Sequence, residues 1–287
     1  MTEIYFNHNT GLPGDVLSAI EKIEALLCSG KWLLAMEKAA VTLETYPDTV
    51  ELLWLHARAA EMGNQVNAAL RDYAKLRRLQ PDDLDLVYDQ ADLLLSLGYI
   101  DDSLRLIRRG EESEPDSIEY KVLKSLAYSK KGRLNEALKL MENVLATRPE
   151  DPYLLTEAAA IFYLQGDTDS ALETVNHALE IEPGYADAWC QLALIQLSLG
   201  DMKSAEESFQ TALRHNRQLL SAWIGLGQIY LCLYEPEKAK SCFIKVIMIN
   251  PNDQEACQGM AAVYRSLGES SAEMDWLERA AFSDQVE

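Results

Sequence analysis

Apolar residues recur at helical spacing along most of this chain. In the stretch WIGLGQIY, Trp223, Leu226, Gly227 and Tyr230 stand at i, i+3, i+4 and i+7, which places them on one face of an α-helix. A dinucleotide-binding loop would need G-x-G-x-x-G directly after a strand, and the third glycine place here holds Tyr230. The stretch is therefore predicted to be a packing face of a helix and not a phosphate-binding loop.

Three types of residue repeat along the chain with one common period of about 34 residues. We call them the lattice prolines, the lattice glycines and the lattice alanines. They are Pro47, Pro81, Pro115, Pro149, Pro183 and Pro251; Gly30, Gly98, Gly132, Gly166, Gly200 and Gly268; and Ala35, Ala69, Ala137, Ala171, Ala205 and Ala239. Ser103 replaces one lattice alanine, and Arg217 replaces one lattice proline. Three independent residue types with one period indicate internal repeats.

Each repeat is predicted to be a helix, a turn and a second helix. An apolar run of about a dozen residues precedes each lattice glycine, a second amphipathic run follows it, and the lattice proline ends the unit because proline cannot continue a helix. A small residue also recurs in the first helix: Ala57, Ala91, Ser125, Ala159, Ala193, Gly227 and Ala261. Small side chains in both helices allow close approach, while Tyr73, Phe209 and Phe243 are expected to fill the space between repeats.

At this point the sequence resembles the tetratricopeptide repeat family, whose pattern is W-x2-L-G-x2-Y, then A-x3-F, then P. Residues 220–253 match every place of that pattern: Trp223, Leu226, Gly227, Tyr230, Ala239, Phe243 and Pro251. Eight repeats fit end to end, starting near residues 16, 50, 84, 118, 152, 186, 220 and 254. The resemblance covers residues 16–287 and leaves residues 1–15 as an N-terminal extension. It implies an all-α fold, a right-handed α-solenoid superhelix of about eight helix-turn-helix repeats.

Three repeats depart from the pattern. The first has Ile23 where a small residue is expected in its first helix. The fourth has Lys121 and Lys124 at places that are usually apolar, so its first helix is expected to be shifted by about one residue, which would turn Tyr120, Leu123 and Ala127 inward. The eighth has no capping helix after it, although a terminal repeat needs a polar outer face. The apolar residues that then need cover, within the last repeat or against another molecule, are Met274, Trp276, Leu277 and Phe282.

The resemblance also implies a binding groove lined by the first helices, with side chains about two, five, nine and twelve residues into each repeat facing it. The candidate partner-binding residues are Trp54, Arg58, Tyr88, Asp92, Val122, Leu126, Tyr153, Thr156, Ala160, Tyr163, Cys190, Leu194, Leu197, Ile224, Gln228 and Leu231. This groove is acidic and aromatic toward its N-terminal end and mostly apolar in the middle. Some family members grip acidic C-terminal tails with lysines, arginines and asparagines in the groove, and the places of that clamp hold Glu, Asp, Tyr, Val and Thr here.

The predicted partner is another protein or peptide. We expect an apolar or amphipathic segment, such as a helix with basic flanks, to lie in the groove. The alternative is that the apolar residues are covered by the curvature of the superhelix or by the N-terminal extension, which contains Tyr5 and Phe6. Self-association through the uncapped C-terminal repeat is a further interpretation.

Charge and composition narrow the partners and the compartment. The formal net charge of −20 opposes binding to nucleic acid. Between Arg148 and Lys203 there is no lysine or arginine, which indicates either a solvated acidic surface or a docking face for a basic partner. The N-terminus has no secretory signal, and no apolar run approaches the ~18 residues of a membrane span. With five cysteines and no C-x-x-C, these features predict a cytoplasmic protein that does not insert into membranes.

No pattern in the chain predicts catalysis, a metal or a cofactor. The four histidines are scattered, without an H-E-x-x-H motif or a cysteine partner at ligand spacing, and no nucleophile elbow or phosphate-binding loop occurs. We therefore predict a non-enzymatic scaffold, adaptor or chaperone. The alternatives are an accessory or targeting subunit of an enzyme or of a secretion or assembly complex, and a self-assembling structural protein.

Overall fold

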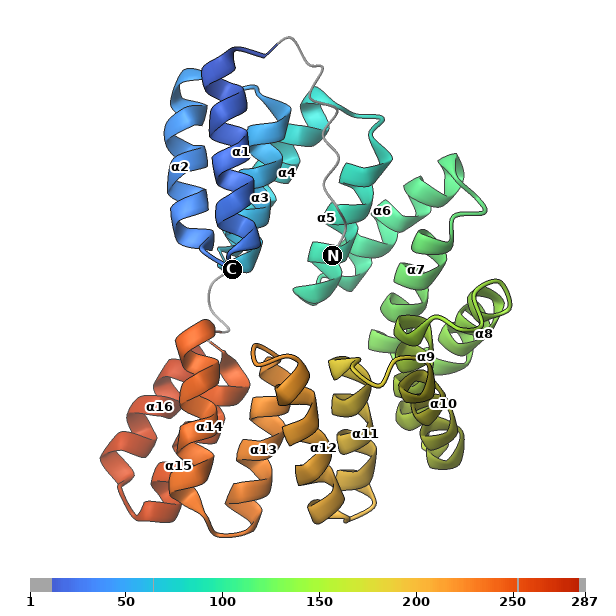
Figure 1. Cartoon of the computed structure of the whole chain (residues 1–287), viewed down its shortest axis with the longest axis vertical. Coiled ribbons are helices and arrows are strands. Elements are labelled where there is room, and N and C mark those ends of the chain that lie inside the picture. Colours follow the sequence, from blue (N-terminus) through green and yellow to red (C-terminus); the bar gives the residue numbers. More distant parts are fainter. Residues whose placement is uncertain (1–11, 64, 252, 284–287) are drawn as a thin grey trace. The chain divides into compact units, whose positions relative to one another are not determined.

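The computed structural model describes residues 12–63, 65–251 and 253–283, and these residues form helices and no strand (Figure 1). They divide into two compact units, one ending at Leu123 and the other beginning at Lys124. The expected all-α array of helix-turn-helix repeats is confirmed. From the second repeat on, first helices begin at Val50, at Leu84 and at the same place of every later repeat.

The first unit contains three helix pairs. Within it α1 packs on α2 and α3, α2 on α3, α3 on α4, α4 on α5, and α5 on α6. The helices are α1 (Gly14–Cys28), α2 (Trp32–Thr45), α3 (Val50–Met62), α4 (Val66–Leu79), α5 (Leu84–Ser96) and α6 (Ile100–Ser113). Helix α7 (Ile118–Lys130) contains the division between the units.

The second unit continues the same alternation, and among its first helices α9 packs on α11, α11 on α13 and α13 on α15 (Figure 1). Its helices are α8 (Leu134–Leu145), α9 (Pro152–Gln165), α10 (Thr168–Ile181), α11 (Ala186–Ser198), α12 (Met202–His215), α13 (Leu220–Cys232), α14 (Pro236–Ile249), α15 (Gln254–Leu267) and α16 (Ser270–Ser283).

The lattice glycines sit where the first helix turns into the second. All six adopt a left-handed backbone, with φ between 72° and 84°, which costs glycine little because it has no Cβ. At the equivalent place of the seventh repeat stands Tyr234, with φ 59°. The starts of several helices are capped by aspartate, and Asp83, for example, accepts a hydrogen bond from the Leu86 N–H.

The carbonyl at the lattice-proline place is bound in two different ways. Long basic side chains on second helices donate to the carbonyl 28 residues earlier: Lys75 to Pro47, Arg109 to Pro81 and Arg279 to Pro251. In two repeats the tryptophan of the following first helix donates instead, Trp189 to Pro183 and Trp223 to Arg217. Both contacts fix the loop between repeats, where a backbone acceptor has no partner within a helix.

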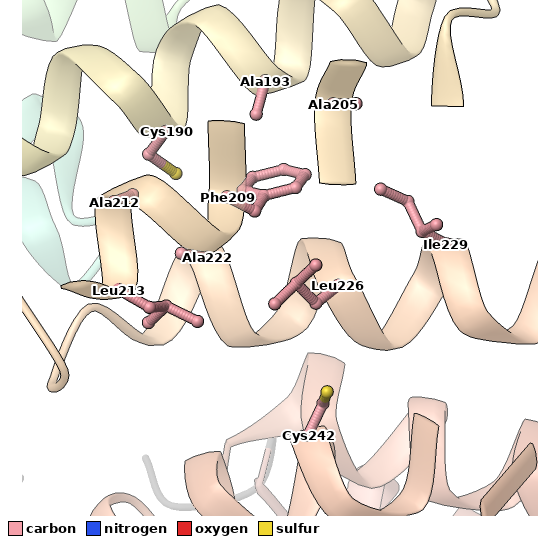
Figure 2. Packing of buried hydrophobic residues seen from close by; sticks show 10 residues of the cluster. All are labelled: Cys190, Ala193, Ala205, Phe209, Ala212, Leu213, Ala222, Leu226, Ile229 and Cys242. Carbon is pink, nitrogen blue, oxygen red and sulfur yellow. The ribbon is translucent and has the colours of Figure 1, made fainter. Parts of the chain in front are cut away.

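The core forms where the small residues were expected. Every lattice alanine is fully buried, as is Ser103, and so are Tyr73 and Phe209. Figure 2 shows the Phe209 ring surrounded by Ala193, Ala205 and Leu226. The predicted close-contact role of Gly227 is confirmed, because a Cβ there would lie 2.6 Å from the Phe243 ring.

Helix α7 keeps the register of the other first helices. Tyr120, Leu123 and Ala127 are buried as expected, but no shift is needed, since α7 begins at the same place as the neighbouring first helices, and the places of Tyr120 and Ala127 are also buried in both neighbouring repeats. Ser125 stands at the small-residue place, and its hydroxyl donates to the Ala137 carbonyl of α8 at 2.7 Å. Lys121 and Lys124 are partly buried.

Candidate partner-binding surface

The residues expected in the groove differ in how accessible they are. Four are buried, eight are partly buried and four are exposed. The buried ones are Val122, Thr156, Cys190 and Ile224; the partly buried ones are Trp54, Tyr88, Leu126, Ala160, Tyr163, Leu194, Leu197 and Leu231; and the exposed ones are Arg58, Asp92, Tyr153 and Gln228. Tyr5 and Phe6, the candidates for covering the groove, lie outside the described residues.

The buried members belong to the packing between helices. The Thr156 hydroxyl donates to the Pro152 carbonyl of its own helix. The Cys190 thiol donates to the Ser221 hydroxyl at 3.3 Å, which joins α11 to α13. Burial raises the pKa of this thiol to about 11, with the Ser221 hydrogen bond acting in the opposite direction, so Cys190 is neutral near pH 7 and is not a reactive thiolate.

The partly buried apolar members in the second unit have one side on the core and one side toward solvent. We call them the apolar strip: Leu126, Ala160, Tyr163, Leu194, Leu197 and Leu231. Leu194 and Leu197 pack against the core around Phe209, and Leu231 packs against the core around Phe243. Leu126 belongs to α7, and the other members come from α9, α11 and α13, which lie side by side.

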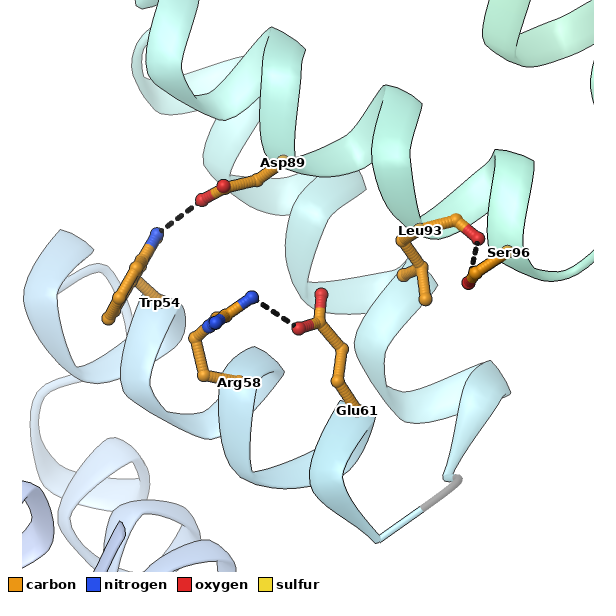
Figure 3. Close-up of polar contacts among 6 residues, drawn as sticks. All are labelled: Trp54, Arg58, Glu61, Asp89, Leu93 and Ser96. Carbon is orange, nitrogen blue, oxygen red and sulfur yellow. Dashed lines mark hydrogen bonds and ion pairs between the residues drawn. The ribbon is translucent and has the colours of Figure 1, made fainter. Parts of the chain in front are cut away.

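The first unit offers a different surface. Figure 3 shows that α3 and α5 face each other with polar side chains. The Trp54 Nε1–H donates to Asp89 Oδ2 at 2.9 Å, and the Arg58 guanidinium pairs with Glu61 at 2.8 Å. Arg58 also lies over the Trp54 ring, with its Cζ 5.6 Å from the ring centroid. We call Trp54, Arg58, Glu61, Asp89 and Asp92 the α3–α5 cluster.

Burial dominates the electrostatics of the α3–α5 cluster. It raises the pKa of Glu61 and of Asp89, and the nearby Arg58 charge opposes this shift in both. The pKa of Asp92, at the exposed edge, is raised by the same loss of hydration and again opposed by Arg58. The single Arg58 guanidinium therefore favours the charged form of all three carboxyl groups.

Asp89 is not among the residues predicted to face the groove, because the family pattern assigns only four places per repeat to it. It stands six residues into its repeat, where the neighbouring repeats have Leu55 and Leu123. An acidic residue at a place that is apolar in both neighbouring repeats was the available indication. Glu157 stands at the same place two repeats later.

Glu157 is a partly buried acid on α9 of the second unit. Burial, and to a smaller extent the nearby Asp187 of α11, raise its pKa to about 7, while Lys130 opposes the shift. A carboxyl group with this pKa changes charge near neutral pH. Among the described residues, no group of three or more histidine, cysteine or acidic side chains could hold a metal ion.

None of the described helices combines the length and apolar character that a bilayer crossing requires. Sequence models of the tetratricopeptide repeat match residues 129–193, 162–226 and 220–253. No relative of this sequence is found among curated proteins.

Several solved structures are similar to the chain in fold. The Cut9–Hcn1 hetero-tetramer of the APC/C has a TM-score of 0.63 at 14% identity, over 94% of this chain and 53% of that one. The human IFIT1 dimer with PPP-AAAA has a TM-score of 0.59 at 18% identity, over 92% and 72%. PilF of Pseudomonas aeruginosa has a TM-score of 0.52 at 15% identity, over 67% and 88%. At these identities the likeness concerns the fold alone.

Proposed function

The chain is a tetratricopeptide-repeat protein, and we propose that it is a non-enzymatic cytoplasmic scaffold, adaptor or chaperone that binds an apolar or amphipathic segment of another polypeptide. Repeat arrays of this kind present extended binding surfaces built from successive units. The first helices carry that surface in this chain.

The apolar strip is the observation that carries the proposal. Its members are neither buried in the core nor isolated on the surface, and those of α9, α11 and α13 follow one another across adjacent helices. An amphipathic helix could lay its own apolar residues against such a row and gain free energy by removing both from water.

The charge of the chain supports a partner with basic flanks. Residues 149–202 contain acidic side chains but no lysine or arginine, and this segment includes most of the strip. A field of one sign attracts a segment of the opposite sign and speeds its association, so binding should weaken as salt is added.

Affinity capture tests the proposal. The tagged chain is used as bait in a cell lysate, and the captured proteins are quantified by mass spectrometry. The variant Leu194→Asp/Leu231→Asp places charges in the strip on two adjacent helices. It should lose the partners that the unchanged chain retains, because a buried, unpaired carboxylate is unfavourable in an apolar contact.

Leu164→Asp/Leu199→Asp is the matched control, since both leucines are exposed and lie outside the strip. It should capture the same proteins as the unchanged chain. Circular dichroism must show equal helicity for all three proteins, and Leu194→Gln provides a milder change if the aspartates perturb folding. Capture of the same proteins by every strip variant would contradict the proposal.

A second candidate function, self-assembly, is favoured by one observation. Leu277 of α16 stands exactly one repeat after the fully packed Phe243, yet its side chain is 40% exposed, and Met274 is 60% exposed. We expect Met274→Glu/Leu277→Glu to lower the mass measured by light scattering if a second copy covers this face. An identical mass for both proteins at all concentrations would exclude it.

A further inference from the structure

The α3–α5 cluster has more acidic than basic groups. Glu61, Asp89 and Asp92 all lie near Arg58, which makes its ion pair with Glu61. Asp89 accepts a hydrogen bond from the neutral Trp54 indole. Among the described residues, no hydrogen bond or ion pair to Asp92 is found, although it lies at the accessible edge. The cluster therefore has an excess of acidic groups that a further cation would balance.

A buried hydroxyl at the base of the cluster is also incompletely paired. Tyr73 of α4 is fully buried, and its hydroxyl lies beside Glu61 and Arg58. No hydrogen bond of regular geometry joins this hydroxyl to either of them. An unpaired buried hydroxyl is unfavourable. The free protein therefore has a polar group next to the cluster whose hydrogen bonding is not satisfied.

The arrangement of the groups selects the kind of cation. The acids do not converge as metal ligands, and no described group of acidic side chains could hold a metal ion. Instead the carboxylates lie beside the aromatic rings of Trp54 and Tyr88. Flat aromatic faces beside carboxylates suit a guanidinium, which stacks on rings and forms two parallel hydrogen bonds with one carboxylate.

Arg58 of the chain itself shows this mode of binding. Its guanidinium lies over the Trp54 ring and pairs with Glu61. A second guanidinium arriving from outside would find Asp89 and Asp92 one helical turn apart on α5. A compact, strongly hydrated ammonium group would gain less from the aromatic neighbours.

We propose that the α3–α5 cluster binds an arginine side chain of the partner polypeptide, with Asp89 and Asp92 as the carboxylates that receive it. The inference rests on the proposed function, because it names one chemical feature of the partner that the scaffold binds. It places this contact in the first unit, separate from the apolar strip of the second unit.

Calorimetric titration with synthetic peptides tests the inference. The probe is an amphipathic leucine–alanine peptide with two arginines one helical turn apart. A second peptide carries citrulline in their place, which keeps the planar shape without the charge, and a third carries lysine. The arginine peptide should bind most tightly, the lysine peptide less tightly, and the citrulline peptide about tenfold or more weakly than the arginine peptide.

The variant Asp89→Asn/Asp92→Asn should weaken binding of the arginine peptide by about tenfold or more. Asparagine retains an oxygen that can accept the Trp54 hydrogen bond, so the fold is preserved. The control Glu37→Gln/Glu44→Gln removes the same charge from exposed positions on α2 and should leave binding unchanged. No binding of the arginine peptide, equal binding of the citrulline peptide, or equal loss in the control would overturn the inference.

Affinity capture separates this inference from the proposed function. If Asp89→Asn/Asp92→Asn retains the cellular partners at full strength while Leu194→Asp/Leu231→Asp loses them, the arginine contact is wrong and the scaffold function stands. If the strip variant loses no partner, the proposed function itself fails. Loss of partners in both variants supports both.

Discussion

Tyr234 shows at the scale of a single residue how the repeat constrains its turn. The lattice glycines adopt left-handed backbones without a steric penalty, whereas Tyr234 adopts φ 59° with a Cβ that crowds the backbone. Its side chain is 91% exposed, so packing does not offset the cost. The repeat tolerates the residue because the two helices on either side determine the path of the turn.

Replacing Tyr234 by glycine should therefore stabilise the protein. Relief of left-handed strain is worth roughly 1–2 kcal/mol, and the greater freedom of glycine in the unfolded chain removes part of it. We expect Tyr234→Gly to raise the free energy of unfolding by about 0.5–1 kcal/mol in urea denaturation. Gly200→Tyr, the reverse change at an equivalent place, should lower it. A less stable Tyr234→Gly protein would contradict this explanation of the turn.

Glu157 makes stability depend on pH. Its pKa of about 7 in the folded chain exceeds the ordinary value of 4.5, so folding favours the protonated acid. The unfavourable effect of ionisation is absent below pH 4.5, grows as pH rises and is complete above pH 7. Glu157→Gln should therefore stabilise the protein more at pH 8 than at pH 5, by about 1–2 kcal/mol after allowance for solvent screening.

Urea denaturation of both proteins at the two pH values measures this difference. Glu173→Gln on α10 is the control, because Glu173 is exposed. Its effect should be the same at pH 5 and pH 8. An equally constant effect of Glu157→Gln would show that burial of the Glu157 carboxyl group does not influence folding.

At the scale of helices, two aromatic rings set the spacing of the last repeats. The Phe243 ring lies between Gly227 of α13 and Gly259 of α15, and a Cβ at either place would lie within 2.6 Å of a ring atom. Phe209 stands in the same relation to Gly225. The glycines of WIGLGQIY are thus needed for close approach of helices, not for a turn.

Gly227→Ala should destabilise the protein although alanine favours helices. The ring of Phe243 cannot retreat because Gly259 lies on its other side, and overpacking of this kind costs about 1–3 kcal/mol. Phe243→Leu should reduce the penalty in a double-mutant cycle. Gly14→Ala is the control, since nothing lies near the added Cβ there. Thermal unfolding distinguishes the variants, and an unchanged Gly227→Ala midpoint would refute the contact.

The helix pairs could be predicted from the sequence because their causes are local. The lattice residues mark the turn, the close contact and the end of each unit, and each acts within its own repeat or on the next one. Burial within the groove was not predictable in the same way. Ile224 is only 9% exposed and Gln228 is exposed, although the family pattern assigns both to the groove. The packing of adjacent first helices determines how far each groove residue is exposed, and the sequence of one repeat alone does not specify that packing.

The hydrogen bonds to the carbonyl at the lattice-proline place could not be predicted either, because different residue types form them in different repeats. Lys75, Arg109 and Arg279 bind carbonyls 28 residues earlier, while Trp189 and Trp223 do the same for a carbonyl six residues earlier. Different side chains thus donate a hydrogen bond to the same carbonyl position of the loop between repeats. A search for identical residues at one place cannot detect such an exchange.

At the scale of the whole molecule, the two units differ in the chemistry they present. The α3–α5 cluster is acidic and aromatic, whereas the apolar strip is rich in leucine. The net charge of −20 gives both an acidic surrounding. Together these features favour the proposed partner, which carries apolar residues and positive charge, and oppose a nucleic acid as partner.

Photochemical cross-linking tests the central claim, that the first helices hold the partner, most directly. A benzophenone amino acid is placed either at Leu197 in the apolar strip or at Asn176, which is exposed on the second helix α10. After irradiation with captured partner present, the account predicts a covalent adduct from position 197 and none from position 176. An adduct from position 176 with none from position 197 would contradict it.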